Sequence, residues 1–301
     1  MSEENIKADT SCCAYCGVAE VDEIKLTECS DCDLVRYCSV KCQKEHKSQH
    51  QQECKKQVDE LHDELLFKQP ESSHIGDCPI CMIPLSIDQT KSGVWSCCSK
   101  VICKGCAHAN ILREEDKKLQ HACPFCREPV PSTQEQCDKQ MMKRVAANDP
   151  VAMRRKGIQQ HKKGDYRSAF EYYTRAAELG DAAAQCNLAS LYEFGKGVEK
   201  DGGKAVHYLE EAAIGGDPIA RNRLGRIEGN IGNTERAVKH CIIAANLGDD
   251  GSIKMMMLMF RNGLVSKDDL ASTLRAHQAA VDATKSPQRE VAEEYDRLFH
   301  H

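Results

Sequence analysis

Cysteine spacing constrains this chain more than any other feature, because 16 of its 19 cysteines lie before residue 127. They fall into two sets. The first set is spaced C-x2-C-x12-C-x2-C-x5-C-x3-C-x7-H-x3-C and consists of Cys13, Cys16, Cys29, Cys32, Cys38, Cys42, His50 and Cys54. A CxxC pair can hold one ion about 2.3 Å from each sulfur, and ligands four residues apart share a helix face. The set therefore predicts two tetrahedral zinc sites.

A disulfide scaffold is the competing interpretation of so many cysteines, and it requires an oxidising compartment. The N-terminal residues MSEENIKADTSCC contain no apolar signal segment. No run approaches the roughly 18 apolar residues of a membrane span. We therefore expect zinc ligands rather than disulfides, a cytoplasmic or nuclear location, and no membrane partner. The net charge of -5 argues against a nucleic-acid partner.

The first set resembles the MYND zinc finger, most closely in RYCSVKCQKEHKSQHQQEC. The resemblance implies interleaved sites, with Cys13, Cys16, Cys38 and Cys42 on one ion and Cys29, Cys32, His50 and Cys54 on the other. Cys12 is an alternative to Cys13. MYND fingers bind short proline-containing peptides through a Gln and a Trp; here Gln43 matches the Gln, and Lys47 stands at the Trp position.

The second set is spaced C-x2-C-x16-C-x4-C-x2-C-x16-C-x2-C and consists of Cys78, Cys81, Cys98, Cys103, Cys106, Cys123 and Cys126. With CPIC, CKGC and CPFCR, it resembles a RING finger. The resemblance implies one ion on Cys78, Cys81, Cys103 and Cys106. A second ion would be held by Cys98, Cys123, Cys126 and a fourth ligand.

Lys100 stands where the RING family places that fourth ligand, a histidine. A protonated ammonium cannot ligate zinc. Cys97 is the first candidate to replace it, followed by His121 and His108, and a vacant site is the remaining alternative. Each complete site has four protein ligands and no open position, so we expect structural rather than hydrolytic zinc.

RING fingers recruit a ubiquitin-charged E2 enzyme, and the resemblance assigns E2 or ubiquitin contacts to Ile80, Pro124 and Arg127. It implies an E3 ubiquitin ligase that positions a substrate for transfer. Ile80 and Pro124 could instead only pack their turns, and Arg127 could be a solvated charge. The aromatic residue that RING fingers frequently carry between their sixth and seventh ligands is missing here. A non-enzymatic interaction adaptor is therefore the alternative, and the ligand spacing alone does not decide whether the chain is an enzyme.

Helical repeats are predicted beyond the cysteines. TRAAELGDAAA, EEAAIGGDPIA and IIAANLGDDGS align, and their aspartates Asp181, Asp217 and Asp249 recur 36 and 32 residues apart, with Asp149 preceding them by 32. Such periods indicate stacked helix pairs. YEFGKGVEKDGGKAVHYLEEAA resembles the Sel1-like repeat, a relative of the TPR. The resemblance implies a concave surface for partner proteins.

These patterns predict a multi-domain chain: two small cross-brace zinc-binding domains followed by an all-α Sel1-like repeat solenoid. The MYND finger covers residues 13–54, a helical linker 55–77 and the RING-type finger 78–130. A linker covers 131–148, the repeats 149–283, and a capping helix 284–301. We expect Val291, Tyr295, Leu298 and Phe299 to form the inner face of that last helix. The MMMLMF run at 255–260 is predicted to be a core helix face, with a peptide-binding patch as the alternative.

Overall fold

The computed structural model describes residues 12–22, 24–32 and 35–299. Positions 23, 33–34 and 300–301 of the predicted domains lie outside the described residues. The described chain forms two compact units, residues up to 68 and residues from 69. No helix in the described ranges is both long and apolar enough to cross a membrane.

The first unit pairs a two-stranded antiparallel sheet with one long helix. Strands β1 (Thr27–Glu28) and β2 (Arg36–Tyr37) are followed by helix α1 (Val40–Leu66). The Ser39 side chain caps α1 by accepting a hydrogen bond from the Cys42 N–H. The buried cluster combines Leu26 and Tyr37 with cysteines of the first set. The metal ligands are therefore a large part of the core that this unit can bury.

The second unit begins with the second cysteine set. Strands β3 (Ser92–Val94) and β4 (Val101–Cys103) form an antiparallel hairpin, preceded by a short 3-10 helix, η1 (Gln89–Lys91). Helix α2 (Lys104–Asp116) follows directly, and the Cys103 side chain caps its first turn through the Cys106 N–H. Here too, cysteines make up most of the buried cluster, together with Leu85 and Ile102.

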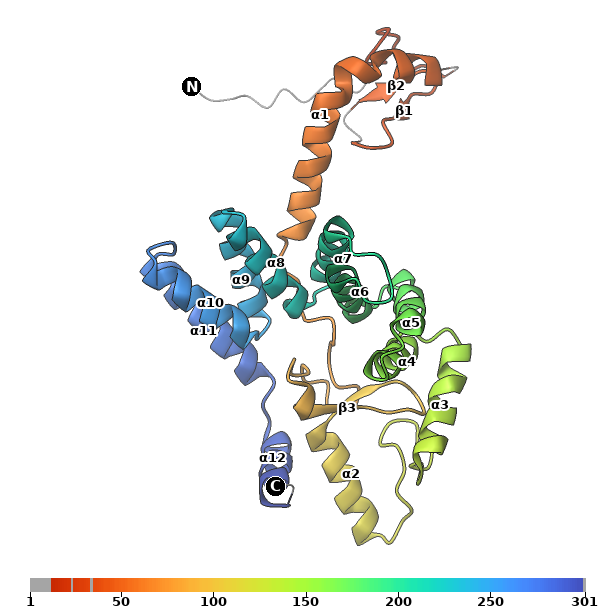
Figure 1. Cartoon of the computed structure of the whole chain (residues 1–301), viewed down its shortest axis with the longest axis vertical. Coiled ribbons are helices and arrows are strands. Elements are labelled where there is room, and N and C mark those ends of the chain that lie inside the picture. Colours follow the sequence, from red (N-terminus) through yellow and green to blue (C-terminus); the bar gives the residue numbers. More distant parts are fainter. Residues whose placement is uncertain (1–11, 23, 33–34, 300–301) are drawn as a thin grey trace. The chain divides into compact units, whose positions relative to one another are not determined.

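Antiparallel helix pairs build most of the rest of the second unit (Figure 1). The pairs are α4 (Pro150–Lys162) with α5 (Tyr166–Glu178), α6 (Ala182–Phe194) with α7 (Gly202–Ile214), α8 (Pro218–Asn230) with α9 (Thr234–Asn246), and α10 (Asp250–Arg261) with α11 (Lys267–Ala283). Small residues allow close packing, since Ala205, Ala212 and Ala213 are at most 5% exposed. A cysteine-rich N-terminal region thus precedes an all-helical solenoid of stacked helix pairs.

The recurring aspartates have a structural explanation. Asp149, Asp181, Asp217 and Asp249 are the N-caps of α4, α6, α8 and α10, and each carboxylate accepts backbone N–H hydrogen bonds. Glycine is needed at Gly197, which has φ of 73° and where a Cβ would lie 2.6 Å from the carbonyl carbon of Tyr166. The repeat hallmarks are therefore caps and close contacts.

Two predictions about segments outside the repeats are wrong. The linker predicted at 131–148 contains helix α3 (Gln134–Ala146), because Met141 and Val145 bury an apolar face against α4. The last helix, α12 (Pro287–Phe299), packs against α2, and the face expected to point inward is largely exposed there. Val291, Tyr295, Leu298 and Phe299 are 42–68% exposed, whereas Arg289 and Ala292 are buried.

Two further segments differ in part from expectation. The predicted helical linker 55–77 is helical only as far as Leu66, and its last residues contact the solenoid, since the His74 N–H donates to the Gly216 carbonyl and the Asn246 amide donates to Gln69. In the methionine run, Met256 and Met259 lie in the core, whereas Met257 and Leu258 are 40% and 57% exposed. Only one side of α10 is therefore a core face.

Candidate metal centres

Four groups of potential metal ligands assemble in the described chain. In each group, the ligand atoms all lie within 4.8 Å of one another. The groups are Cys13, Cys16, Cys38 and Cys42; Cys29, Cys32, His50 and Cys54; Cys78, Cys81, Cys103 and Cys106; and Cys97, Cys98, Cys123 and Cys126. The structure thus brings together every residue that the sequence assigned to metal binding.

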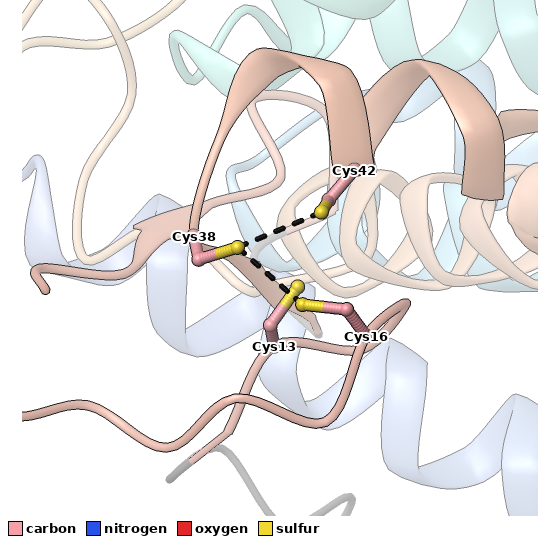
Figure 2. Close-up of side chains that lie close together, drawn as sticks. All are labelled: Cys13, Cys16, Cys38 and Cys42. Carbon is pink, nitrogen blue, oxygen red and sulfur yellow. Dashed lines mark hydrogen bonds between the residues drawn. The ribbon is translucent and has the colours of Figure 1, made fainter.

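The first group joins a loop to the start of α1. Figure 2 shows the four thiols pointing toward one another, with the Cys38 sulfur 3.5 Å from the sulfurs of Cys16 and Cys42. Four thiolates around an ion at about 2.3 Å would be separated by about 3.8 Å in a tetrahedron. The donor set and its spacing therefore fit zinc.

The second group uses the same helix about two and three turns beyond Cys42. His50 and Cys54 are buried on α1, and the His50 Nε2 lies 3.2 Å from the Cys32 sulfur. Cys29 and Cys54 bring their sulfurs to 3.9 Å. The His46 ring stacks on the His50 ring at 5.7 Å and shares a 3.1 Å hydrogen bond with the Tyr37 hydroxyl. His46, outside the ligand group, thus helps to fix the His50 ring.

The thiols of the first ligand group differ in how easily they ionise. Burial opposes ionisation of Cys13, but N–H groups of Cys16 and Cys38 outweigh it and lower the Cys13 pKa to about 6. Hydrogen bonds with the thiols of Cys16 and Cys42 raise the pKa of Cys38 to about 12. Neighbouring thiolates repel, so only a bound cation stabilises all four in the ionised state.

One turn geometry recurs four times among the described residues of the two cysteine sets. In each turn, the first N–H donates to the carbonyl five residues later, and the N–H four residues later donates back to the first carbonyl. The fifth residue has positive φ. The turns start at Cys13, Cys78, Trp95 and Cys123, and their positive-φ residues are Gly17, Met82, Ser99 and Arg127. An antiparallel bridge or pair flanks each one.

The Trp95 turn explains how adjacent cysteines can serve one site. Trp95 occupies the position of the first cysteine of a CxxC turn, so Cys98 occupies the position of the second cysteine. Cys97 supplies the other thiol from within the turn, with its sulfur 3.3 Å from that of Cys126. Sequence reasoning missed this turn, because its first position lacks a cysteine.

The other candidates for the fourth ligand lie elsewhere. Lys100 extends toward the Phe125 ring, 5.9 Å from its centroid. The His121 Nδ1 lies 3.2 Å from the buried Glu114 carboxylate. The His108 ring packs against Tyr295 at 4.7 Å. Neither histidine belongs to a ligand group of the described residues.

The residues that the RING resemblance assigned to E2 contacts have different surroundings. Ile80 is 41% exposed between Cys78 and Cys81. Pro124 is buried. Arg127 is exposed on its turn, but its guanidinium donates a 2.7 Å hydrogen bond to the Asn110 side chain of α2. Of these three residues, Ile80 alone is exposed without a side-chain anchor in the contacts described.

The first unit also contains a cavity of about 590 Å3 beside the second ligand group. Tyr37, Val40 and Val58 supply apolar lining, whereas Gln43 and Lys47 supply polar lining. Lys44 and Lys55 add two further ammonium groups, and Asp31 adds one carboxylate. The cavity therefore suits an apolar side chain flanked by negative charge.

Comparisons with known proteins agree with the two outer parts of this architecture. The MYND finger family model matches residues 13–54, and the Sel1 repeat model matches residues 151–181, 182–217 and 218–249. The curated proteins named "DAP3-binding cell death enhancer 1" from Mus musculus and Rattus norvegicus are 26% and 25% identical over 175 residues. These alignments cover 44% of this chain and 34% of each relative. The chain thus spans about a third of their length.

Solved structures include a Sel1 repeat protein from Oxalobacter formigenes, with 26% identity, coverage of 59% of this chain and 72% of that chain, and a TM-score of 0.45. A protective antigen of uropathogenic Escherichia coli, described as displaying an SLR fold, has 20% identity, coverage of 57% and 37%, and a TM-score of 0.41. Because its residues 13–54 and 151–249 match these two family models, the chain contains a MYND finger and Sel1 repeats. The MYND finger implies bound zinc. Both modules mediate protein interactions.

Proposed function

We propose that this chain is a non-enzymatic, zinc-dependent interaction adaptor of the cytoplasm or nucleus. Its zinc ligands would be the four groups described above, with a second cross-brace finger over residues 78–130 and repeats over 149–283. All four groups offer four protein donors, which leaves no open coordination position for hydrolytic chemistry. The relative named for binding DAP3 supports a protein-binding role of this class.

The MYND cavity is the observation that carries this proposal. Its apolar floor and its lysines would bind a short peptide whose apolar residue stands beside acidic ones. Peptide display against the zinc-loaded chain should enrich such sequences. Lys47→Glu should reverse the preference for acidic residues.

The control is Lys56→Glu, because Lys56 lies on α1 outside the cavity lining and its side chain is 75% exposed. It adds the same charge to the same helix and should leave the enriched sequences unchanged. Equal responses of the two variants would indicate bulk electrostatics rather than binding in the cavity. Enrichment that is the same with and without a zinc chelator would contradict a zinc-dependent adaptor.

A RING-type E3 ubiquitin ligase is the second candidate, favoured by the exposed Ile80 beside a four-cysteine group. It predicts that the chain accelerates discharge of ubiquitin from a charged E2. Ile80→Ala should slow that discharge, whereas Met82→Ala, an exposed neighbour, should not. No acceleration over a chelator-treated control would reject this candidate. Unchanged discharge by Ile80→Ala and Arg127→Ala would reject the assigned surface.

A further inference from the structure

Arg289 of helix α12 is buried beside a ligand group more than 180 residues earlier in the chain. Its side chain is 7% exposed. One terminal nitrogen donates to the carbonyls of Pro84 and Thr284 at 2.6 and 2.7 Å. The other donates to the Ile83 carbonyl at 3.0 Å and lies 3.5 Å from the Cys81 sulfur. A single guanidinium thus joins the last helix, the Cys78 turn and a candidate zinc ligand.

The contact between α12 and the finger is close and specific. A Cβ at Gly105 would lie 2.9 Å from the Arg289 backbone nitrogen, so this approach requires glycine on the first turn of α2. Ala292 is 3% exposed at the same contact. Ion pairs Lys104–Asp296 and Lys91–Glu293 flank it. Helix α12 therefore packs against the first turn of α2, the segment that positions Cys103 and Cys106.

A buried cation beside this group has a chemical role. Zinc held by four thiolates carries a net charge of about -2, which is costly to bury without compensation. A guanidinium that donates to a sulfur offsets part of that charge and makes the thiolate less prone to protonation or attack. Its bonds to Ile83 and Pro84 also fix the loop that follows Cys81.

We propose that Arg289 is a positioning residue for zinc at Cys78, Cys81, Cys103 and Cys106, so that α12 is an integral part of the second finger. This inference rests on the proposed zinc occupancy of that group. It predicts that loss of Arg289 weakens metal retention there and leaves the MYND sites unaffected. The effect of removing such a ligand-supporting group is about 10- to 100-fold in metal affinity.

The test measures zinc transfer to a chromogenic chelator from the full chain, together with alkylation of each cysteine followed by mass spectrometry. Arg289→Met keeps an unbranched apolar chain close in length to the aliphatic stem of arginine and removes the charge and the donors. We expect alkylation of Cys81 and Cys106 to accelerate at least about tenfold, with unchanged rates at Cys29 and Cys54. Arg297→Met, an exposed arginine on the same helix, is the matched control.

A second variant separates a local effect from loss of α12. Arg289→Lys keeps the charge but loses the forked donors, so hydrogen exchange should show α12 still protected while Cys81 alkylation accelerates to a lesser extent. Unchanged Cys81 alkylation in Arg289→Met would overturn the inference. If wild-type Cys78, Cys81, Cys103 and Cys106 are alkylated as fast as in chelator, the zinc assignment itself fails and the inference fails with it.

Discussion

Asp181 accepts a 3.0 Å hydrogen bond from the guanidinium of Arg154, which lies on the preceding repeat, while its carboxylate also caps α6 through the Ala184 N–H. The same relationship links α8 to the start of α10. The Asn222 amide donates to the carboxylate of Asp249, the N-cap of α10, which again lies 27 residues after the donor. At Asp181 and Asp249, the aspartate that starts a repeat thus also binds a side chain of the repeat before it. A single side chain contributes both to helix capping and to stacking.

Substitution Asp181→Ala should therefore cost more than the loss of a cap. We expect a loss of about 2–3 kcal/mol in unfolding free energy, because the cap is worth about 1 kcal/mol and Arg154 loses its charged partner. Asp201→Ala should cost about 1 kcal/mol, since Asp201 caps α7 and its side chain is 41% exposed. Denaturant unfolding followed by circular dichroism compares the two. Equal losses would contradict the second role of Asp181.

The positive φ in the metal-binding turns leads to a prediction that one substitution stabilises the chain. Met82 has φ of 56° and a side chain that is 69% exposed, so it bears backbone strain with little packing to compensate. Met82→Gly should stabilise the zinc-loaded chain by about 1 kcal/mol. Met82→Ala keeps the strain and should not stabilise. Thermal unfolding of the zinc-loaded variants measures both, and equal shifts in Tm would attribute the gain to side-chain loss.

Metal content tests the Cys97 assignment. Four ligand groups predict four zinc ions per chain by elemental analysis combined with native mass spectrometry. Cys97→Ser should reduce this to three, because a hydroxyl is a poor zinc ligand. Lys100→Ala and His121→Ala should retain four. Loss of an ion in His121→Ala, with four ions retained in Cys97→Ser, would show that His121 and not Cys97 is the fourth zinc ligand.

The sequence predicted best where one short segment carries the whole signal. Asp149, Asp181, Asp217 and Asp249 cap helices locally, so their spacing, with the aligned segments around them, indicated the helix pairs. The contact of Arg289 with Cys81 could not be foreseen, since nothing in PQREVAEEYDRLF indicates which surface it covers. Its apolar residues suggested an inner face, yet of the four expected there only Tyr295 has a described contact with α2, at His108, and the helix docks mainly through Arg289, Ala292 and ion pairs.

The ion pair of Asp149 with Arg144 predicts a pH dependence. Burial opposes ionisation of Asp149, but hydrogen bonds from Arg144 and the Ala152 N–H lower its pKa below 3.8. A lowered folded-state pKa stabilises the fold above the unfolded value and loses that contribution as pH falls through the folded value. Asp149→Asn keeps a good cap but lacks the charge.

The free-energy gap between wild type and Asp149→Asn should therefore be full near pH 7 and shrink below about pH 4. Urea unfolding in the presence of a chelator, followed through helix content, keeps zinc out of the comparison at every pH. A gap that stays constant down to pH 3 would show that the Arg144 pair contributes nothing to stability.

Removing the metal should unfold the fingers and spare the repeats. Cysteines supply most of the buried residues in both cysteine-rich clusters, whereas Ala, Met and Val make up most of the repeat clusters. Without zinc, the fingers would have to bury unpaired thiolates or lose their cores, and structural zinc contributes on the order of 10 kcal/mol. Hydrogen exchange after chelation should show loss of protection in α2 and retention in α6 and α8.

Helix α12 should lose protection together with α2, because its buried contacts are with α2 and the loop after Cys81. Protection of α12 that outlasts that of α2 would assign its stability to the solenoid instead.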